Sequence, residues 1–212
     1  MSPLVLAVEP AFLSVGTVRA AAALARLLEA PLVAAGLPSD GRPNRRDAAE
    51  GLEEALRLAR EKGVEVIVRH LEGDPEKALV ACVRETGAGI VIFSDDPEST
   101  RIEGLTAALI RSLPAALLLV RDPEPLVAWA HGEQALQTLL AMDFSACSRT
   151  ALSWILGLRT RAPVDLELLH VSWLPGQRRR LGMTTPEDPR VEEAEVRRVL
   201  LREMAGFVGD VP

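Results

Sequence analysis

Cysteines, long apolar runs and a secretory leader are scarce or missing in this sequence, and each shortage excludes a class of protein. The two cysteines, Cys82 and Cys147, belong to no metal-binding or redox motif, which argues against a disulfide-bonded or zinc-stabilised fold. No stretch approaches the roughly 20 apolar residues of a membrane span. The opening MSPLVLAVEP lacks the basic region of a signal peptide. We therefore expect a cytoplasmic protein that contacts no membrane.

Aromatic residues are also scarce, at 3% with no tyrosine, so alanine, leucine and valine must fill the core. The 212 residues are 48% hydrophobic and 25% charged, as in soluble globular proteins. The formal net charge of −6 argues against nucleic acid as a partner, because phosphate backbones attract basic surfaces. The Gly-x-Ser-x-Gly, His-Glu-x-x-His and Walker motifs are absent. We therefore expect no enzyme.

Short apolar runs alternate with helical patterns through the first 121 residues. Strands are expected over 4–8, 31–37, 64–70, 90–93 and 115–121, and helices over 17–29, 45–62, 75–86 and 103–112. Asp74-Pro75 marks one helix start, because aspartate caps a helix and proline suits its first turn. The alternation predicts an α/β fold, with a parallel sheet covered by helices on both faces.

The pattern then repeats. After an expected linker at 122–134, a strand ends in Asp143 much as the first strand ends in Glu9, and each is followed by a helix, an Ala-Pro pair and a strand. The sequence is thus an internal repeat, with a first domain at 1–121 and the N-terminal half of a second at 135–212. Two strands and two helices form a small core. We expect this half to need further residues, the first copy or another chain.

Three segments resemble universal stress proteins. LEGDPEKALVACVRETGAGIVIFS (71–94) is similar to the exit of strand three, the next helix and strand four of that family, and RSLPAALLLVRDP (111–123) to its last turn and fifth strand. MDFSACSRTALSWILGLRTRAPVDLELLHV (142–171) resembles the family's opening. The resemblance implies a tandem protein with a flavodoxin-like, Rossmann-like sheet in the order 3-2-1-4-5. It also implies a homodimer formed through strand five, which would cover an apolar edge.

The resemblance further implies where a ligand would bind. Some members bind ATP with an aspartate at the end of strand one and a Gly-x₂-Gly-x₉-Gly-Ser/Thr loop after strand four. In the first copy Glu9 replaces the aspartate, Ser94 and Gly104 fall at loop positions, and no motif glycine stays in register. Strands one and four are neighbours at the switch point, so Glu9, Ser94, Asp95 and Asp96 should converge and repel a triphosphate. We expect a degenerate ATP site there.

The acidic loop allows other interpretations. Asp95 and Asp96 precede a helix, where carboxylates stabilise the helix dipole, and they could also face a protein partner. Together with Glu9 they could instead form a cation site, because carboxylate oxygens suit Mg²⁺ or Ca²⁺.

The second copy keeps the family's aspartate. Its candidate ligand residues are Asp143, Ser145 and Val171, but the 212 residues contain no phosphate loop for this copy. ATP is therefore the one cofactor considered, and only at this copy. The basic run GQRRRLG (176–182) is expected to be a solvated loop, or a contact for acidic partners or phosphates.

Three hypotheses for function follow from these observations. The leading one is a non-enzymatic universal-stress-type protein that acts through protein contacts, as a homodimer and with a protein partner of unknown identity. The second is an ATP-binding, possibly slowly ATP-hydrolysing, protein that uses Asp143. The third is a regulatory module for a transporter or kinase.

Overall fold

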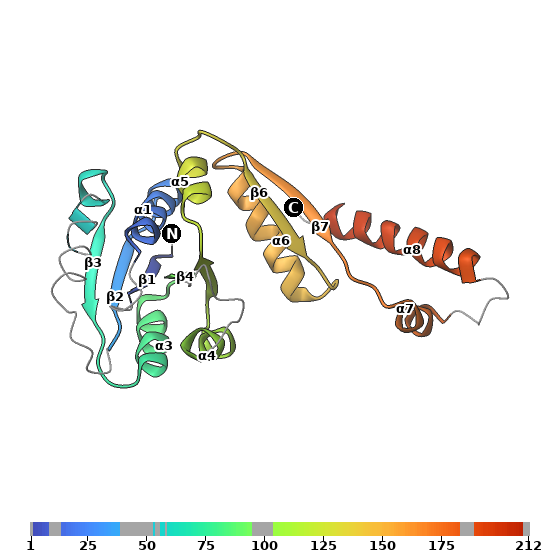
Figure 1. The fold of residues 1–212 in the computed structure, drawn as a ribbon, viewed down its shortest axis with the longest axis horizontal. Helices are drawn as coiled ribbons and strands as arrows, with labels where there is room; N and C mark the ends of the chain where they lie inside the picture. The colour runs from blue at the N-terminus through green and yellow to red at the C-terminus, as the bar shows by residue number, and fades with distance from the viewer. Residues whose placement is uncertain are drawn as a thin grey trace. The chain divides into compact units, whose positions relative to one another are not determined.

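The computed structural model describes residues 2–8, 14–38, 53, 56–57, 59–94, 104–182 and 189–209. The chain divides into two compact units, Met1–Gln134 and Ala135–Pro212, and Figure 1 shows the elements of each. Three residues of the expected sites, Glu9, Asp95 and Asp96, lie outside the described residues. Their convergence stays a prediction.

The first unit contains a five-stranded parallel sheet, as predicted. Its strands are β1 (Leu4–Val8), β2 (Leu32–Gly36), β3 (Val66–His70), β4 (Ile90–Ser94) and β5 (Ala116–Val120). Their order is β3-β2-β1-β4-β5, which confirms the flavodoxin-like order, and each neighbouring pair is parallel. Because β1 lies between β2 and β4, the carboxyl ends of β1 and β4 form the switch point.

Four helices of this unit have defined bounds: α1 (Val15–Leu28), α3 (Pro75–Thr86), α4 (Gly104–Ser112) and α5 (Glu124–Ala130). The expected cap of α3 is present, since the Lys77 backbone N–H donates to Asp74 Oδ1 at 2.9 Å. Gly87 follows α3 with φ 65°, a left-handed conformation that suits glycine. Helical residues are also described at 53, 56–57 and 59–61.

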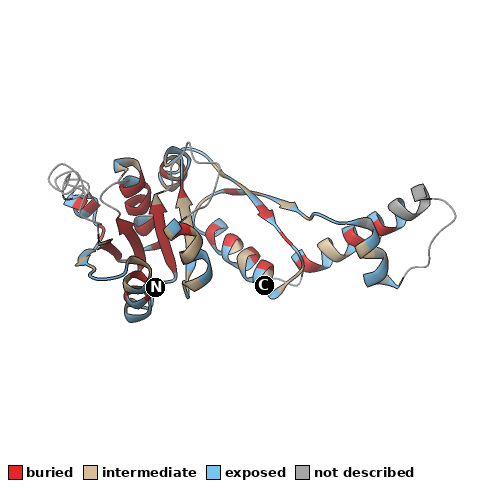
Figure 2. Ribbon diagram, turned by 60° about the horizontal axis from the view of Figure 1, so that its bottom comes forward, coloured by how far each residue is buried: buried red, intermediate tan, exposed pale blue. Residues whose placement is uncertain are grey.

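The core of the first unit has two layers because alternate strand residues point to opposite faces of the sheet. Val5 and Ala7 of β1 belong to a buried cluster with Leu79 of α3 and Leu109 of α4. The remaining residues of β1 are also buried, and they point to the opposite face. Figure 2 shows the central strands buried along their length, as expected of a sheet covered on both faces.

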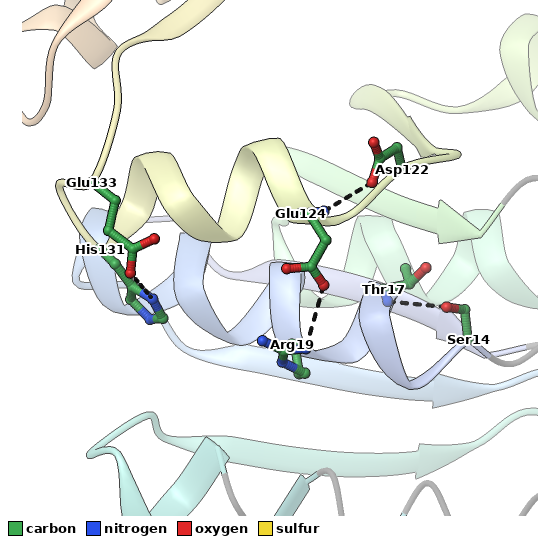
Figure 3. A network of polar contacts seen from close by, with 7 residues as sticks. All are labelled: Ser14, Thr17, Arg19, Asp122, Glu124, His131 and Glu133. Carbon is green, nitrogen blue, oxygen red and sulfur yellow. Dashed lines mark hydrogen bonds and ion pairs between the residues drawn. The ribbon is translucent and has the colours of Figure 1, made fainter.

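The segment 122–134, expected to be a linker, contains the helix α5. This helix packs against α1 and buries Val127 and Trp129, which are 5% and 1% exposed. Figure 3 shows the polar contacts along this pair, including the 3.3 Å ion pair between Arg19 Nη1 and Glu124 Oε1. The spacing of these two apolar residues is too short to give a clear helical period, which is why the sequence did not reveal it.

The second unit holds β6 (Leu136–Ala141), α6 (Ala146–Arg159), β7 (Val164–Leu169), α7 (Leu174–Leu181) and α8 (Pro189–Gly209). Within the described residues β6 pairs with β7 alone, in parallel. The basic run at 176–182, expected to be a loop, lies largely in α7. Arg180 forms an ion pair with Glu203 of α8, so the run has a structural partner. No helix in the described ranges is long and apolar enough to span a membrane.

Candidate functional site

The strongest candidate site lies at the carboxyl ends of β6 and β7. Because the two strands are parallel, their ends meet, and an open cleft of about 550 Å³ is found there. The cleft is lined by Ala141, Met142, Asp143, Ser145, Cys147, Ser148, Ala151, Leu169 and Val171. The structure thus brings together the three residues that the sequence singled out in this copy. It adds Ser148, which follows Ser145 by one helical turn.

The loop between β6 and α6 is built around a helix cap. Ser145 is the N-cap of α6, and its hydroxyl accepts a hydrogen bond from the Ser148 backbone N–H at 3.2 Å. Asp143 Oδ1 accepts from the Ser145 backbone N–H at 3.0 Å and from the Ser148 hydroxyl at 2.9 Å. These bonds hold the carboxylate in a defined position at the mouth of the cleft.

The same bonds govern the ionisation of Asp143. The Ser145 side chain, the Ser145 backbone N–H and the Ser148 hydroxyl stabilise the carboxylate and lower the pKa of Asp143 to about 2. The carboxylate is therefore ionised at any physiological pH and can only accept hydrogen bonds. A ligand that contacts it must present a positive charge or hydrogen-bond donors such as an amino group or hydroxyls.

A titration tests this description of Asp143. Side-chain carbon NMR should give a pKa near 2 for Asp143, and Ser148→Ala should raise it toward the ordinary value of 3.8. Since the folded-state pKa is lowered, the carboxylate stabilises the fold above about pH 4, and this contribution disappears as the pH falls toward 2. Ser153→Ala, in the same helix but bonded to the Arg149 carbonyl at 3.0 Å, should leave the pKa unchanged. An unchanged pKa in Ser148→Ala would contradict the description.

Phe144 separates the two polar residues of the loop and has φ 64°, in a region that non-glycine residues seldom adopt. Its ring lies 4.7 Å from the His170 ring and 5.9 Å from the ring of Phe207 in α8. These contacts offset the backbone strain. The left-handed turn lets Asp143 and Ser145 both contribute to the cap.

His170 directly follows β7, and both of its ring nitrogens have polar neighbours. Its Nδ1 lies 2.8 Å from the Met142 carbonyl oxygen. A carbonyl only accepts hydrogen bonds, so Nδ1 must donate and carry the proton. Gln177 Nε2 lies 3.4 Å from the other ring nitrogen. The imidazole thereby joins the two strand ends that form the cleft.

The switch point of the first unit has different polar contacts from the site at the ends of β6 and β7. Ser14 caps α1 by accepting from the Thr17 backbone N–H at 3.4 Å, as Ser145 does in the second unit. The Thr17 hydroxyl, however, donates to Ser94 Oγ at 3.2 Å, so Ser94 contacts α1. Counting back two residues along the sequence from each cap places Phe12 opposite Asp143. Aligned on the caps, the first copy has no carboxylate at that position.

The remaining candidate residues, all in the first unit, do not form a ligand site among the described residues. Gly104 is the exposed first residue of α4, with φ 58°. The expected cation site of Glu9, Asp95 and Asp96 lies in the undescribed segments. Among the described residues, no group of three or more His, Cys, Asp or Glu side chains could hold a metal ion.

These elements define an α/β protein of flavodoxin-like fold with a helix-capped cleft in its second unit. A solved protein from Pseudomonas aeruginosa UCBPP-PA14 assigned to the universal stress proteins has a TM-score of 0.67 to this chain at 17% identity, over 98% of this chain and 70% of its own. A functionally unknown protein from Pseudomonas aeruginosa PAO1 gives the same values. The resemblance predicted from the sequence is thus confirmed at the level of the fold.

A further comparison covers only part of the chain. A universal stress protein from Archaeoglobus fulgidus, solved in complex with dAMP, matches 57% of this chain at 24% identity with a TM-score of 0.45. No protein-family model matches the sequence, and the search of curated proteins gives no significant match.

Proposed function

We propose that this chain is a non-enzymatic protein of the universal stress type that binds a nucleoside-like ligand in its second unit and acts through protein contacts. The observation that supports the ligand site is the Asp143 carboxylate, kept ionised by Ser145 and Ser148 beside a cleft of about 550 Å³. A nucleoside offers an apolar ring for the cleft, and amino and hydroxyl donors for the carboxylate.

The proposal assigns the site to the second unit only. In the first unit Ser94 is bonded to Thr17, and cap alignment gives no carboxylate opposite Asp143. The second unit has no glycine-rich phosphate loop within the 212 residues. For the 212-residue chain we therefore expect phosphate groups to add little to binding, because this segment supplies no such loop of backbone N–H donors.

Calorimetry with adenosine and ATP tests this assignment. Both should bind with dissociation constants within about threefold of each other, and Asp143→Ala should weaken both at least about tenfold, as expected for loss of a charged acceptor. Asp165→Ala, which removes another exposed carboxylate of the second unit, should leave binding unchanged. ATP binding much tighter than adenosine binding would contradict the proposal. So would no heat with either ligand at millimolar concentration, or phosphate release from ATP.

Protein contacts are supported by a different observation. Leu139 of β6 and Trp154 of α6 are 61% and 44% exposed, so each offers a large apolar side chain at the surface. These side chains suit a second protein surface, either another copy of the chain or a partner such as a transporter or kinase. Light scattering at tens of micromolar should give a dimer. A monomer under these conditions would argue against self-association.

A further inference from the structure

A second cavity lies in the first unit, between α1, α5 and the end of the helical stretch that includes Ala59. Its volume is about 140 Å³. A cavity of roughly 150 Å³ lined by apolar side chains accommodates one benzene molecule, so this one has room for an apolar group of about six carbons. It is lined by Val15, Arg19, Ala22, Ala23, Arg26, Ala59, Lys62, Val127 and His131.

The lining residues of α1 lie along one face of the helix, so the cavity extends along the helix axis. Five lining residues of α1 stand at positions i, i+4, i+7, i+8 and i+11 and therefore form one stripe along the helix: Val15, Arg19, Ala22, Ala23 and Arg26. The small side chains of Ala22 and Ala23 leave room in the middle of this stripe. Ala22, Ala23, Ala59 and Val127 are all buried and form apolar walls.

The wall formed by α5 is held firmly against α1. A Cβ atom on Gly16 would lie only 2.5 Å from Pro123 Cγ, so the start of α5 approaches α1 closely. Arg19 pairs with Glu124 at 3.3 Å, and Val127 lies buried further along. Along the two helices, residue 16 of α1 lies beside residue 123, and residue 19 lies beside residue 124 of α5. The helices therefore run in the same direction, as Figure 3 also shows. Their carboxyl-terminal ends, at Arg26 and His131, are therefore at the same end of the cavity.

The charged residues of the lining are all of one sign. Among the lining residues that the structure describes, four of the nine are basic and none is acidic, although the whole chain has 30 acidic residues against 24 lysines and arginines. Arg19 and His131 already face carboxylates, Glu124 at 3.3 Å and Glu133 at 3.7 Å. In the part of the chain that the structure describes, no ion pair involves Arg26 or Lys62.

The cavity lining therefore offers a guanidinium and an ammonium group that form no ion pair with the described residues. Arg26 is also in the last turn of α1, where a cation stabilises the helix dipole. A dipole end carries only about half a unit charge, so the full charge of Arg26 is not cancelled. An apolar body beside two available cations suits a molecule with one apolar part and one anionic group.

We infer that this cavity binds a small amphipathic monocarboxylate, with its hydrocarbon part between α1 and α5 and its carboxylate at Arg26 and Lys62. Arginine and lysine both donate charge-assisted hydrogen bonds to carboxylates, and the alanine and valine walls exclude water from the hydrocarbon. The site is built only from residues of the first unit and does not depend on Asp143.

NMR titration of the full chain tests the inference, with hexanoate as the probe and hexan-1-ol and hexylammonium as uncharged and cationic controls. Hexanoate should bind saturably with a dissociation constant of about 1 mM or below, shifting the backbone amides of Val15, Ala23, Ala59 and Val127. Hexan-1-ol should bind more weakly, and hexylammonium should cause no saturable shift at these residues.

Amino-acid substitutions distinguish the contribution of the two cations to binding from that of the apolar cavity. The double substitution Arg26→Gln with Lys62→Gln should weaken hexanoate at least about tenfold, as expected for loss of charge-assisted bonds, and should change hexan-1-ol binding less than twofold. Arg84→Gln is a matched control, because Arg84 is in the last turn of α3. It should leave hexanoate binding intact, as should Asp143→Ala. Equal binding of hexylammonium, shifts confined to the Asp143 cleft, or no saturation by about 20 mM would overturn the inference.

Discussion

Replacing Trp129 by alanine should destabilise the first unit by about 3–5 kcal/mol, the usual effect of truncating a large buried aromatic side chain. Trp129 is 1% exposed and belongs to α5, a helix of only seven residues. So short a helix is not stable by itself and depends on its packing against α1. Hydrogen exchange should show loss of protection in α5 first. Hexanoate binding should be lost with it, since Val127 would no longer line the cavity.

Two variants serve as controls for Trp129. The indole Nε1 is buried with no hydrogen-bond partner in the described residues, so Trp129→Phe removes an unsatisfied donor and should cost much less than Trp129→Ala. Trp154→Ala, at a tryptophan that is 44% exposed, should have a small effect. If Trp129→Ala destabilises the unit no more than Trp154→Ala does, the buried indole ring is not what holds α5.

Phe207→Ala should have the largest effect in the second unit, about 3 kcal/mol or more. Phe207 is 3% exposed. Its ring meets the Phe144 ring edge-on, with 5.9 Å between centroids, and the Arg149 guanidinium lies 4.6 Å from its centre. Aromatic pairs and cation–π contacts each add stability beyond the buried area. Hydrogen exchange should show about 100-fold less protection in α8, which corresponds to roughly 3 kcal/mol.

Phe207→Leu and Val208→Ala provide the comparison for that prediction. Leucine keeps most of the apolar volume and loses the ring contacts, so its effect should be intermediate. Val208 follows Phe207 in α8 but is 41% exposed, and its truncation should change protection little. If Phe207→Ala leaves α8 as protected as Val208→Ala does, the aromatic cluster does not attach this helix.

The alternation of apolar strands and helices was enough to predict the sheet of the first unit, because strands buried on both faces give continuous apolar runs such as that at 90–93. The same reasoning missed α5, whose helical signal is limited to Val127 and Trp129. It also predicted a loop for the basic run that lies in α7. The partner of Arg180 is Glu203 of α8, which is distant in sequence, so the local pattern could not reveal this contact.

The second-copy site was predictable in part. Asp143 and Ser145 follow the end of a strand and precede a helix, so their position could be read from local pattern. Ser148 could have been found by asking which residue stands at the third position after an N-cap serine. For the first copy, alignment on the predicted strand ends pairs Glu9 with Asp143, whereas alignment on the helix caps pairs Phe12 with it. Most of this difference arises because the segment from Val8 to the Ser14 cap is two residues longer than the segment from Ala141 to Ser145.

The difference between β1 and β6 has a consequence for handling the protein. β1 is paired on both sides, whereas in the described part of the chain β6 is paired only with β7, so a row of its backbone donors and acceptors can recruit another polypeptide. Leu139, in that strand, is 61% exposed and would favour such recruitment. The solubility of preparations at high concentration should therefore be limited by the second unit. Charged substitutions at Leu139 offer a direct way to improve it.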